Sequence, residues 1–353
     1  MKKVLCLLFV VLCTFTLVPN VHAVPEYENI NQDSISVITS DVVNTIQEML
    51  GSIRMEADSY GLQKIDFLKL KIGTEIPAYN SYSERIINIR YFPIFEGSRI
   101  VAIATIHADN FENPQITIGV DFGPKLQLLI ENNNNYALLF EGDSLYAITP
   151  NKKALLHVFP GLVDKHLTSP IESSIVYSKS EPLISLVVNS TSILSTSKYL
   201  SVPIKLQGDY PICWAASIAS IGQYKTGINK TAKEVCDDAG TGYIGLSMIY
   251  CRDVLIDQYS LNNVIRWYPP TKAKIVNDIN NYNPIFAGFY KGNMGHAVVF
   301  RGYYEYSPTN FMISYMDPNY STFKAISVTT DQDYSIVYGS DILNCKEYIE
   351  LTY

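Results

Sequence analysis

The spacing of apolar residues changes twice along the chain, and no other feature constrains the fold as strongly. Between about residues 65 and 150, apolar and polar residues alternate in short runs separated by turns such as Glu96-Gly97-Ser98. Alternation with a period of two is typical of antiparallel strands. Residues 213–279 instead show helical spacing, and alternation returns after Pro284. Strands followed by helices and then by further strands predict an α+β protein.

The helical stretches begin and end at recognisable residues. One is predicted at 41–50, with Gly51 as its stop. Another begins at Cys213 and ends before Gly227, and a capping-box pattern at 231–234 opens the next. The remaining predicted elements are helices at 246–259 and 271–279, a hairpin of 285–290 with 296–303, and a strand at 311–316.

The first 23 residues have the three parts of a secretory signal peptide. Lys2 and Lys3 form a basic start, residues 4–18 are apolar, and Val21-His22-Ala23 offers small residues at a cleavage site. The alternative is a membrane anchor, but the apolar run is short for a bilayer span and no basic stop signal follows it. We therefore expect cleavage after residue 23 and a secreted, extracellular or cell-envelope protein without a membrane span.

The net charge excludes one class of partner. The chain carries a formal charge of −7, and its pI is near 5.3. Proteins that bind nucleic acid need a basic patch that attracts phosphates. We therefore expect no nucleic-acid partner.

A stretch rich in Ser and Thr divides the chain into two parts. Residues 187–198 suit an exposed linker, although Ser and Thr mixed with Val, Ile and Leu also fit an edge strand. Our interpretation is a mostly antiparallel β domain at 24–186, this linker, and a second domain at 199–353. The second domain has helices first and an antiparallel sheet second.

Cys213 stands where a helix is predicted to begin. The N–H groups of a first helical turn, and the positive end of the helix dipole, favour a thiolate over a thiol. The Cys213 N–H and the side chain of Gln207, six residues earlier, can stabilise the same oxyanion. The alternative, common for a lone cysteine, is a small buried residue.

His296 and Asp317 are the candidate partners of this cysteine. His296 follows Gly295 at the start of an apolar strand, which leaves one side of the ring open. Asp317 comes 21 residues later, beyond the next strand, where an antiparallel neighbour can place its carboxylate against the imidazole. The alternatives are a structural histidine and an Asp-Pro turn.

Three cysteines besides Cys213 lie beyond the predicted signal peptide, namely Cys236, Cys251 and Cys345. A working nucleophile must stay free, which leaves an odd number for pairing. One disulfide among the three is an option after export, and three small buried hydrophobic residues are the other.

Together these motifs resemble the papain-like cysteine peptidases over about residues 199–353. The compact bacterial members are the most similar, such as the leader-cleaving domains of bacteriocin exporters and the AvrRpt2-type effectors. The resemblance implies Gln207 for the oxyanion hole, Cys213 as nucleophile, His296 as base and Asp317 as the residue that orients it. The chain departs from plant papains, which have Asn at the last position and a Cys-Gly-Ser-Cys-Trp signature that is absent here.

The N-terminal β part resembles the pro-regions of secreted bacterial cysteine peptidases such as streptopain, in stretches around Ile72 and Tyr91. That resemblance implies a pro-domain that acts as an intramolecular inhibitor until the linker is cut. The competing interpretation is a wall-binding or partner-binding module that stays attached.

The predicted function is therefore a cysteine endopeptidase that is made as a zymogen and cuts proteins or peptides through an acyl-enzyme. We expect no metal and no organic cofactor. One alternative is a cell-wall amidase or transpeptidase on the same scaffold, because acyl transfer differs there only in its donor and acceptor. The other is a catalytically inactive binding protein.

Overall fold

The computed structural model describes residues 38–82, 84–107, 114–130, 135–162, 175–179, 182–188, 196–306 and 311–352. All of them belong to the unit Ile38–Tyr353. The predicted signal peptide lies outside them, and its cleavage stays a prediction. No helix within the described ranges has the length and apolar character needed to span a bilayer.

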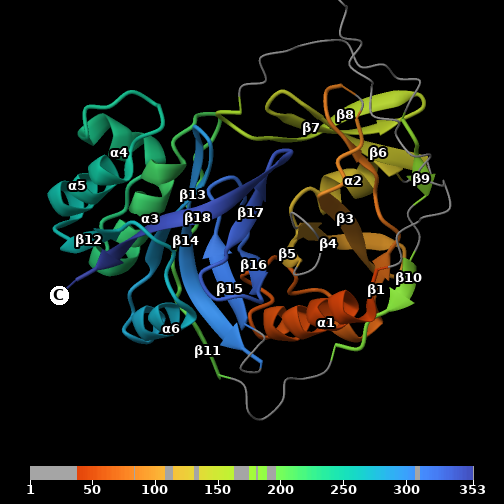
Figure 1. The fold of residues 1–353 in the computed structure, drawn as a ribbon, viewed down its shortest axis with the longest axis horizontal. Helices are drawn as coiled ribbons and strands as arrows, with labels where there is room; N and C mark the ends of the chain where they lie inside the picture. Colours follow the sequence, from red (N-terminus) through yellow and green to blue (C-terminus); the bar gives the residue numbers. More distant parts are fainter. Residues whose placement is uncertain are drawn as a thin grey trace, which may run out of the picture. The chain divides into compact units, whose positions relative to one another are not determined.

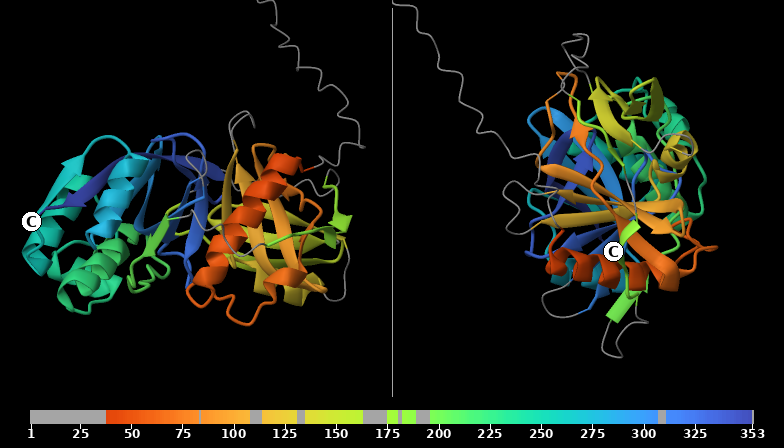
Figure 2. Two further views of the ribbon diagram at one scale, coloured as in Figure 1. Left: turned by 90° about the horizontal axis from the view of Figure 1, so that it is seen from below. Right: turned by 90° about the vertical axis from the view of Figure 1, so that its right-hand side faces the viewer.

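The described residues combine helices with two sheets, which confirms the α+β class (Figures 1 and 2). Helices α3, α4 and α5 gather beside the strands β13, β14 and β18, whereas α1 lies across the strands of the N-terminal part (Figure 1). The helices are α1 (Ser40–Met55), the 3-10 helix η1 (Phe67–Lys69), α2 (Gly123–Ile130), α3 (Cys213–Thr226), α4 (Ala232–Asp238), α5 (Met248–Tyr259) and α6 (Lys272–Asn280).

The larger sheet is antiparallel throughout and has the order β10-β1-β3-β4-β5-β16-β15-β14-β13-β18-β12, with β11 beside β14 and β17 beside β18. Its strands are β1 (Leu70–Gly73), β3 (Ile89–Glu96), β4 (Arg99–His107), β5 (Gln115–Gly119), β10 (Pro182–Ser185), β11 (Thr196–Tyr199), β12 (Asn263–Arg266), β13 (Ile285–Lys291), β14 (Met294–Glu305), β15 (Phe311–Met316), β16 (Lys324–Val328), β17 (Ser335–Tyr338) and β18 (Asp341–Leu351).

The smaller sheet belongs to the N-terminal part and has the order β2-β6-β7-β8, with β9 beside β6. The strand β2 runs parallel to β6, and the other pairs are antiparallel. Its strands are β2 (Ala78–Tyr79), β6 (Asn135–Glu141), β7 (Ser144–Thr149), β8 (Lys152–Val158) and β9 (Ser178–Lys179).

Local signals placed most helix ends correctly. The helix α3 ends at Gly227, whose φ of 78° is the left-handed conformation that glycine adopts without strain. Both bonds of the capping box that opens α4 are present, between Thr231 and Glu234. The predicted stop at Gly51 is wrong. The helix α1 continues to Met55 because Gly51 is buried and Ile53 extends the same buried face.

One sheet connects the two parts of the chain. The strand β5, from the N-terminal part, pairs with β16 from the C-terminal part, in the register Ala325↔Ile118 and Ile326↔Thr117. The strand β11 at the end of the expected linker pairs with β14, while residues 189–195 lie outside the described ranges. The division into a pro-domain, a linker and a peptidase domain stays a prediction.

Buried polar contacts strengthen this junction. The Lys324 ammonium lies 3.1 Å from the Asp121 carboxylate, and both side chains are almost fully buried. Nearby, the side-chain oxygen of Gln115 accepts hydrogen bonds from the Ser335 N–H at 2.7 Å and from its hydroxyl at 2.9 Å. A buried ion pair is costly to break because either charge left alone lacks solvation. Separating the two parts therefore needs more than the loss of apolar contacts.

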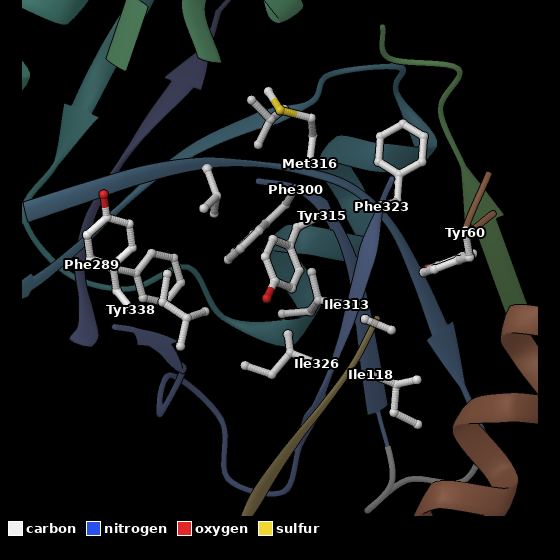
Figure 3. Packing of buried hydrophobic residues seen from close by; sticks show 14 of the residues in the cluster. Tyr60, Ile118, Phe289, Phe300, Ile313, Tyr315, Met316, Phe323, Ile326 and Tyr338 are labelled. Atoms are coloured by element: carbon white, nitrogen blue, oxygen red, sulfur yellow. The ribbon is translucent and has the colours of Figure 1, made fainter. Parts of the chain in front are cut away.

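Arg301 is fully buried in the core, whose aromatic residues include Tyr60 and Phe323 (Figure 3). The Arg301 guanidinium lies 3.8 Å from the centroid of the Phe323 ring, an attractive cation–π geometry. Its Nε and the Tyr60 hydroxyl both donate to the Ser314 hydroxyl, at 3.0 and 2.7 Å. Because Tyr60 follows α1 and Ser314 lies on β15, this cluster also joins the two parts.

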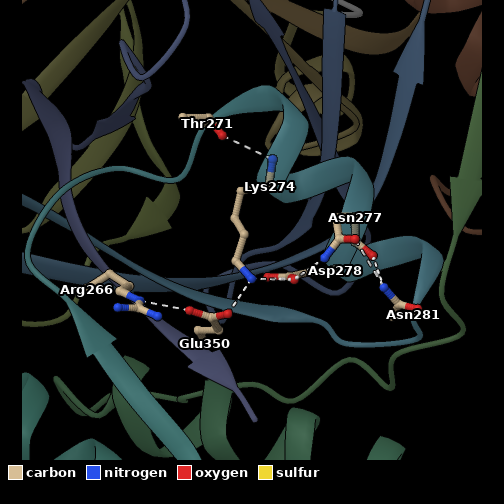
Figure 4. Close-up of polar contacts among 7 residues, drawn as sticks. All are labelled: Arg266, Thr271, Lys274, Asn277, Asp278, Asn281 and Glu350. Atoms are coloured by element: carbon tan, nitrogen blue, oxygen red, sulfur yellow. Dashed lines mark hydrogen bonds and ion pairs between the residues drawn. The ribbon is translucent and has the colours of Figure 1, made fainter. Parts of the chain in front are cut away.

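An ion-pair network fastens α6 to the edge of the larger sheet (Figure 4). Lys274 lies 2.7 Å from Asp278, one helical turn on, and also bonds Glu350 on β18. Glu350 accepts a second bond, at 2.8 Å, from Arg266 on β12. Burial favours the neutral acid, but these two cations outweigh it and lower the pKa of Glu350. The network therefore fixes α6 in place.

We expect that Gly222→Val destabilises the protein strongly, by about 3 kcal/mol, because overpacking forces side chains and backbone apart. Gly222 lies within α3, and a Cβ at this position would collide with the ring of Tyr259 on α5. Thermal unfolding measures the effect. Gly242→Val is the control, since a Cβ at Gly242 meets no atom within 4 Å. Equal unfolding temperatures for the two variants would contradict the close packing of Gly222 against Tyr259.

Candidate active site

Cys213 is the first residue of α3, as predicted. It is partly exposed, and the backbone N–H of Ala297 on β14 donates to its sulfur at 3.4 Å. The first N–H groups of a helix have no partner within the helix and point towards its start. The sulfur therefore lies at the positive end of α3 and is held against β14.

His296 and Asp317 meet as the sequence predicted. His296 is near the start of β14, and Asp317 directly follows β15, which pairs with β14. The His296 Nε2 lies 2.8 Å from the Asp317 Oδ1, and both side chains are buried. Asp317 also accepts the N–H of Asn319 at 3.0 Å, which fixes its carboxylate. Because Nε2 is engaged, the other ring nitrogen, Nδ1, is left for the nucleophile.

Burial and charge act in opposite directions on this pair. Burial disfavours the imidazolium, but the Asp317 carboxylate and then Cys213 outweigh it and raise the pKa of His296. Burial likewise opposes an ionised Asp317, but His296 and then Lys324 outweigh it and lower the pKa of this carboxyl. Both shifts favour an imidazolium beside a carboxylate. Such a pair can hold a proton and keep the ring oriented.

Gln207 lies next to this pair, but its amide is directed at another oxygen. Its backbone N–H donates to the Pro318 carbonyl at 3.0 Å, which places it beside Asp317. The side-chain Nε2 donates to the Tyr210 carbonyl at 3.1 Å. Its Oε1 is buried without a hydrogen-bond partner among the described residues. For a role in an oxyanion hole, the Gln207 amide must therefore give up its hydrogen bond to the Tyr210 carbonyl and donate to the substrate oxygen instead.

Tyr338, the last residue of β17, covers His296 and was missed by the sequence reasoning. The two ring centroids lie 4.4 Å apart with an interplanar angle of 32°. Burial raises the pKa of Tyr338, so its hydroxyl keeps its proton. No local signal marks this residue, because its position depends on how β17 pairs with β18.

A cavity of about 500 Å³ opens in front of the cysteine. The C-terminal part contributes Cys213, His296 and Tyr338 to its lining, together with apolar residues such as Met248 and Phe286. Pro160 and Gly161, from the N-terminal part, line the same cavity. Residues from both parts of the chain therefore meet at the site.

The other three cysteines among the described residues, Cys236, Cys251 and Cys345, are buried and free. Burial raises the pKa of Cys236 to about 11 and raises that of Cys251 well above its ordinary value. These thiols therefore stay protonated at neutral pH. The structure agrees with buried hydrophobic residues rather than with a disulfide.

Comparison with known proteins finds a family on the part of the chain that holds the site. The model of the family described as papain-like cysteine protease AvrRpt2 matches residues 196–333. No curated protein matches the chain. Among solved structures, the crystal structure of UfSP from C. elegans is similar at 12% identity and a TM-score of 0.27, over 42% of this chain and 37% of that chain. The family match spans all four predicted site residues, and it supports a papain-like cysteine peptidase in the part of the chain that holds them.

Proposed function

We propose that the protein is a secreted cysteine endopeptidase that is made as an inactive precursor. The cavity supports this proposal best. It is lined by Cys213 and His296 and also by Pro160 and Gly161, which come from the N-terminal part. A peptide substrate needs that space in order to reach the sulfur. The signal-peptide pattern of the first 23 residues supports secretion.

The proposed reaction starts from a thiolate–imidazolium pair, in which the proton of Cys213 resides on the Nδ1 of His296, since Asp317 holds the Nε2. The thiolate attacks the substrate carbonyl carbon, and the oxyanion accepts hydrogen bonds from the Cys213 N–H and the Gln207 amide. The imidazolium then gives its proton to the leaving amine, and the C–N bond breaks. Water, activated by His296, cleaves the thioester and restores the thiol.

Incubation of the chain without its signal peptide tests this function. We expect the wild type to shorten to a fragment that begins within or next to residues 187–198, because exposed linkers are where chains are cut. The variant Cys213→Ala should keep its full mass under the same conditions. Intact mass spectrometry measures both.

Processing in the Cys213→Ala variant as well would assign the cut to a contaminating protease. If neither protein shortens, an external protease is added and hydrolysis of casein is measured. Activity that appears only in the wild type then supports a peptidase activated by another enzyme. If neither protein hydrolyses casein at this stage, the result would contradict the proposal and favour an amidase or an inactive binding protein.

A further inference from the structure

A short segment of the N-terminal part, Phe159–Leu162, lies at the catalytic cavity directly after β8. Its Pro160 and Gly161 line the cavity together with Cys213 and His296. The segment therefore forms part of the cavity wall near the nucleophile. We name Phe159–Leu162 the stop segment.

The stop segment is bonded to Tyr338, the residue that covers His296. The buried Tyr338 hydroxyl donates to the Pro160 carbonyl at 2.7 Å. Phe159 packs edge-on against the same ring, with the centroids 5.4 Å apart. Tyr338 therefore contacts both the stop segment and His296, the predicted base.

The fit of the stop segment leaves no room for a larger residue at its centre. Gly161 has a φ of +93°, and a Cβ there would lie 2.9 Å from the Cβ of Pro211, just before the cysteine. On the other side, the Leu162 side chain lies against Gly339, where an added Cβ would collide with it. The segment is thus held between the chain before α3 and the turn after β17.

We propose that the stop segment occupies the place of a substrate, and that the Tyr338 hydroxyl binds a backbone carbonyl of the substrate once the segment has left. This rests on the proposed function as a precursor peptidase. The reason is the free energy lost when the Tyr338 hydroxyl is left without a hydrogen-bond acceptor. A buried hydroxyl that loses its acceptor is destabilised, and a peptide entering the cavity supplies a carbonyl to replace that of Pro160. Tyr338 is then a substrate-binding residue for which the precursor's own chain competes.

The first test measures access to the sulfur in the chain from Val24 onward. A thiol-reactive epoxide labels Cys213, and the rate is compared between the wild type, Gly161→Val and Gly97→Val. Both glycines have positive φ, but a Cβ at Gly97 meets nothing within 4 Å. A valine therefore strains the backbone at both positions, and only the one at 161 also pushes on the stop segment. We expect about tenfold faster labelling for Gly161→Val, with Gly97→Val unchanged, since a tenfold change corresponds to one displaced contact of ordinary strength.

The second test separates the hydroxyl from the ring. In the Gly161→Val background, Tyr338→Phe keeps the ring over His296 and removes only the donor. We expect the KM for a short peptide to rise roughly three- to tenfold with kcat nearly unchanged, as expected for one lost hydrogen bond. In the otherwise unchanged precursor, Tyr338→Phe should speed labelling of Cys213. Thermal unfolding confirms that each variant folds.

The outcomes distinguish the possible failures. Equal labelling rates for the wild type and Gly161→Val, with both active on the peptide, would show that the stop segment does not block the sulfur. The proposal that the protein is a peptidase would then still stand. An unchanged KM for the Tyr338→Phe variant would overturn its role in substrate binding. If no variant is labelled at Cys213 and none cuts the peptide, the proposed function fails and this inference fails with it.

Discussion

Cys213→Ala is expected to lower hydrolysis of a protein substrate by about 10⁴- to 10⁶-fold, because removing a nucleophile leaves only binding and the oxyanion donors. The sulfur lies at the start of α3 against the Ala297 N–H, and no other described cysteine combines partial exposure with a cavity wall. Hydrolysis of casein measures the loss. Both proteins are first treated with the same external protease, so that a failure to self-process does not hide the result.

The matched control for this change is Cys236→Ala. Cys236 is buried in α4, and its pKa is raised to about 11 by burial, so it is not a nucleophile at neutral pH. This variant should keep the wild-type rate within about twofold and still be labelled by the epoxide, since surface and core changes away from a site act on stability instead. A loss of activity in Cys236→Ala with full activity in Cys213→Ala would exclude our assignment.

Asp317→Asn is expected to lower kcat roughly 10²- to 10⁴-fold, because the amide cannot hold the imidazole tautomer or stabilise the imidazolium. The carboxylate lies 2.8 Å from the His296 Nε2 and is buried, so water cannot replace it. Steady-state kinetics measure the effect. Asp253→Asn is the control, because Asp253 is a half-exposed partner of Arg252. Equal kcat values for the two variants would remove Asp317 from the mechanism.

The pH profile gives Asp317 a second, independent readout. Burial lowers the pKa of His296, but this carboxylate and then Cys213 outweigh it and raise the pKa from 6.5 to about 10, so the wild type keeps its imidazolium well into the alkaline range. Without the charge, the alkaline limb of the activity profile should move towards neutral pH. A merely structural role would lower the rate without moving this limb.

The same pair links stability to pH. His296, whose pKa is raised, contributes stability that is complete below 6.5 and is lost as the pH rises through its folded value. Asp317, whose pKa is lowered, contributes stability that is complete above 3.8 and is lost as the pH falls through its folded value. The stability difference between the wild type and Asp317→Asn should therefore be largest between these two limits.

The residues that the sequence placed correctly are those marked by local chemistry. Cys213 lies at a helix start, His296 follows a glycine near a strand start, and Asp317 directly follows the next strand. Each signal needs only a few neighbouring residues and one antiparallel pairing. Short-range propensity and hairpin topology were therefore sufficient to bring these three together.

The residues that the sequence missed are placed by contacts between distant segments. Pro160 meets Tyr338 across 178 positions of the chain, and β5 pairs with β16 across about 200. Nothing in the sequence around Pro160 or Tyr338 indicates a partner. The stop at Gly51 failed for a related reason, because burial against the core outweighed the glycine's weak helix propensity.

The strand pairing between β5 and β16 implies that cutting the chain and freeing the site are separate events. A single cut in the connecting segment leaves the backbone bonds of this pair, and the Asp121–Lys324 ion pair, unbroken. The two fragments should thus co-purify as a nicked complex, and proteolytic activity should lag behind the appearance of the cut. Full departure of the N-terminal fragment would also bare the edge of β16, and an unpaired edge invites self-association. The lag time, rather than the cutting rate, would then determine when the enzyme becomes active.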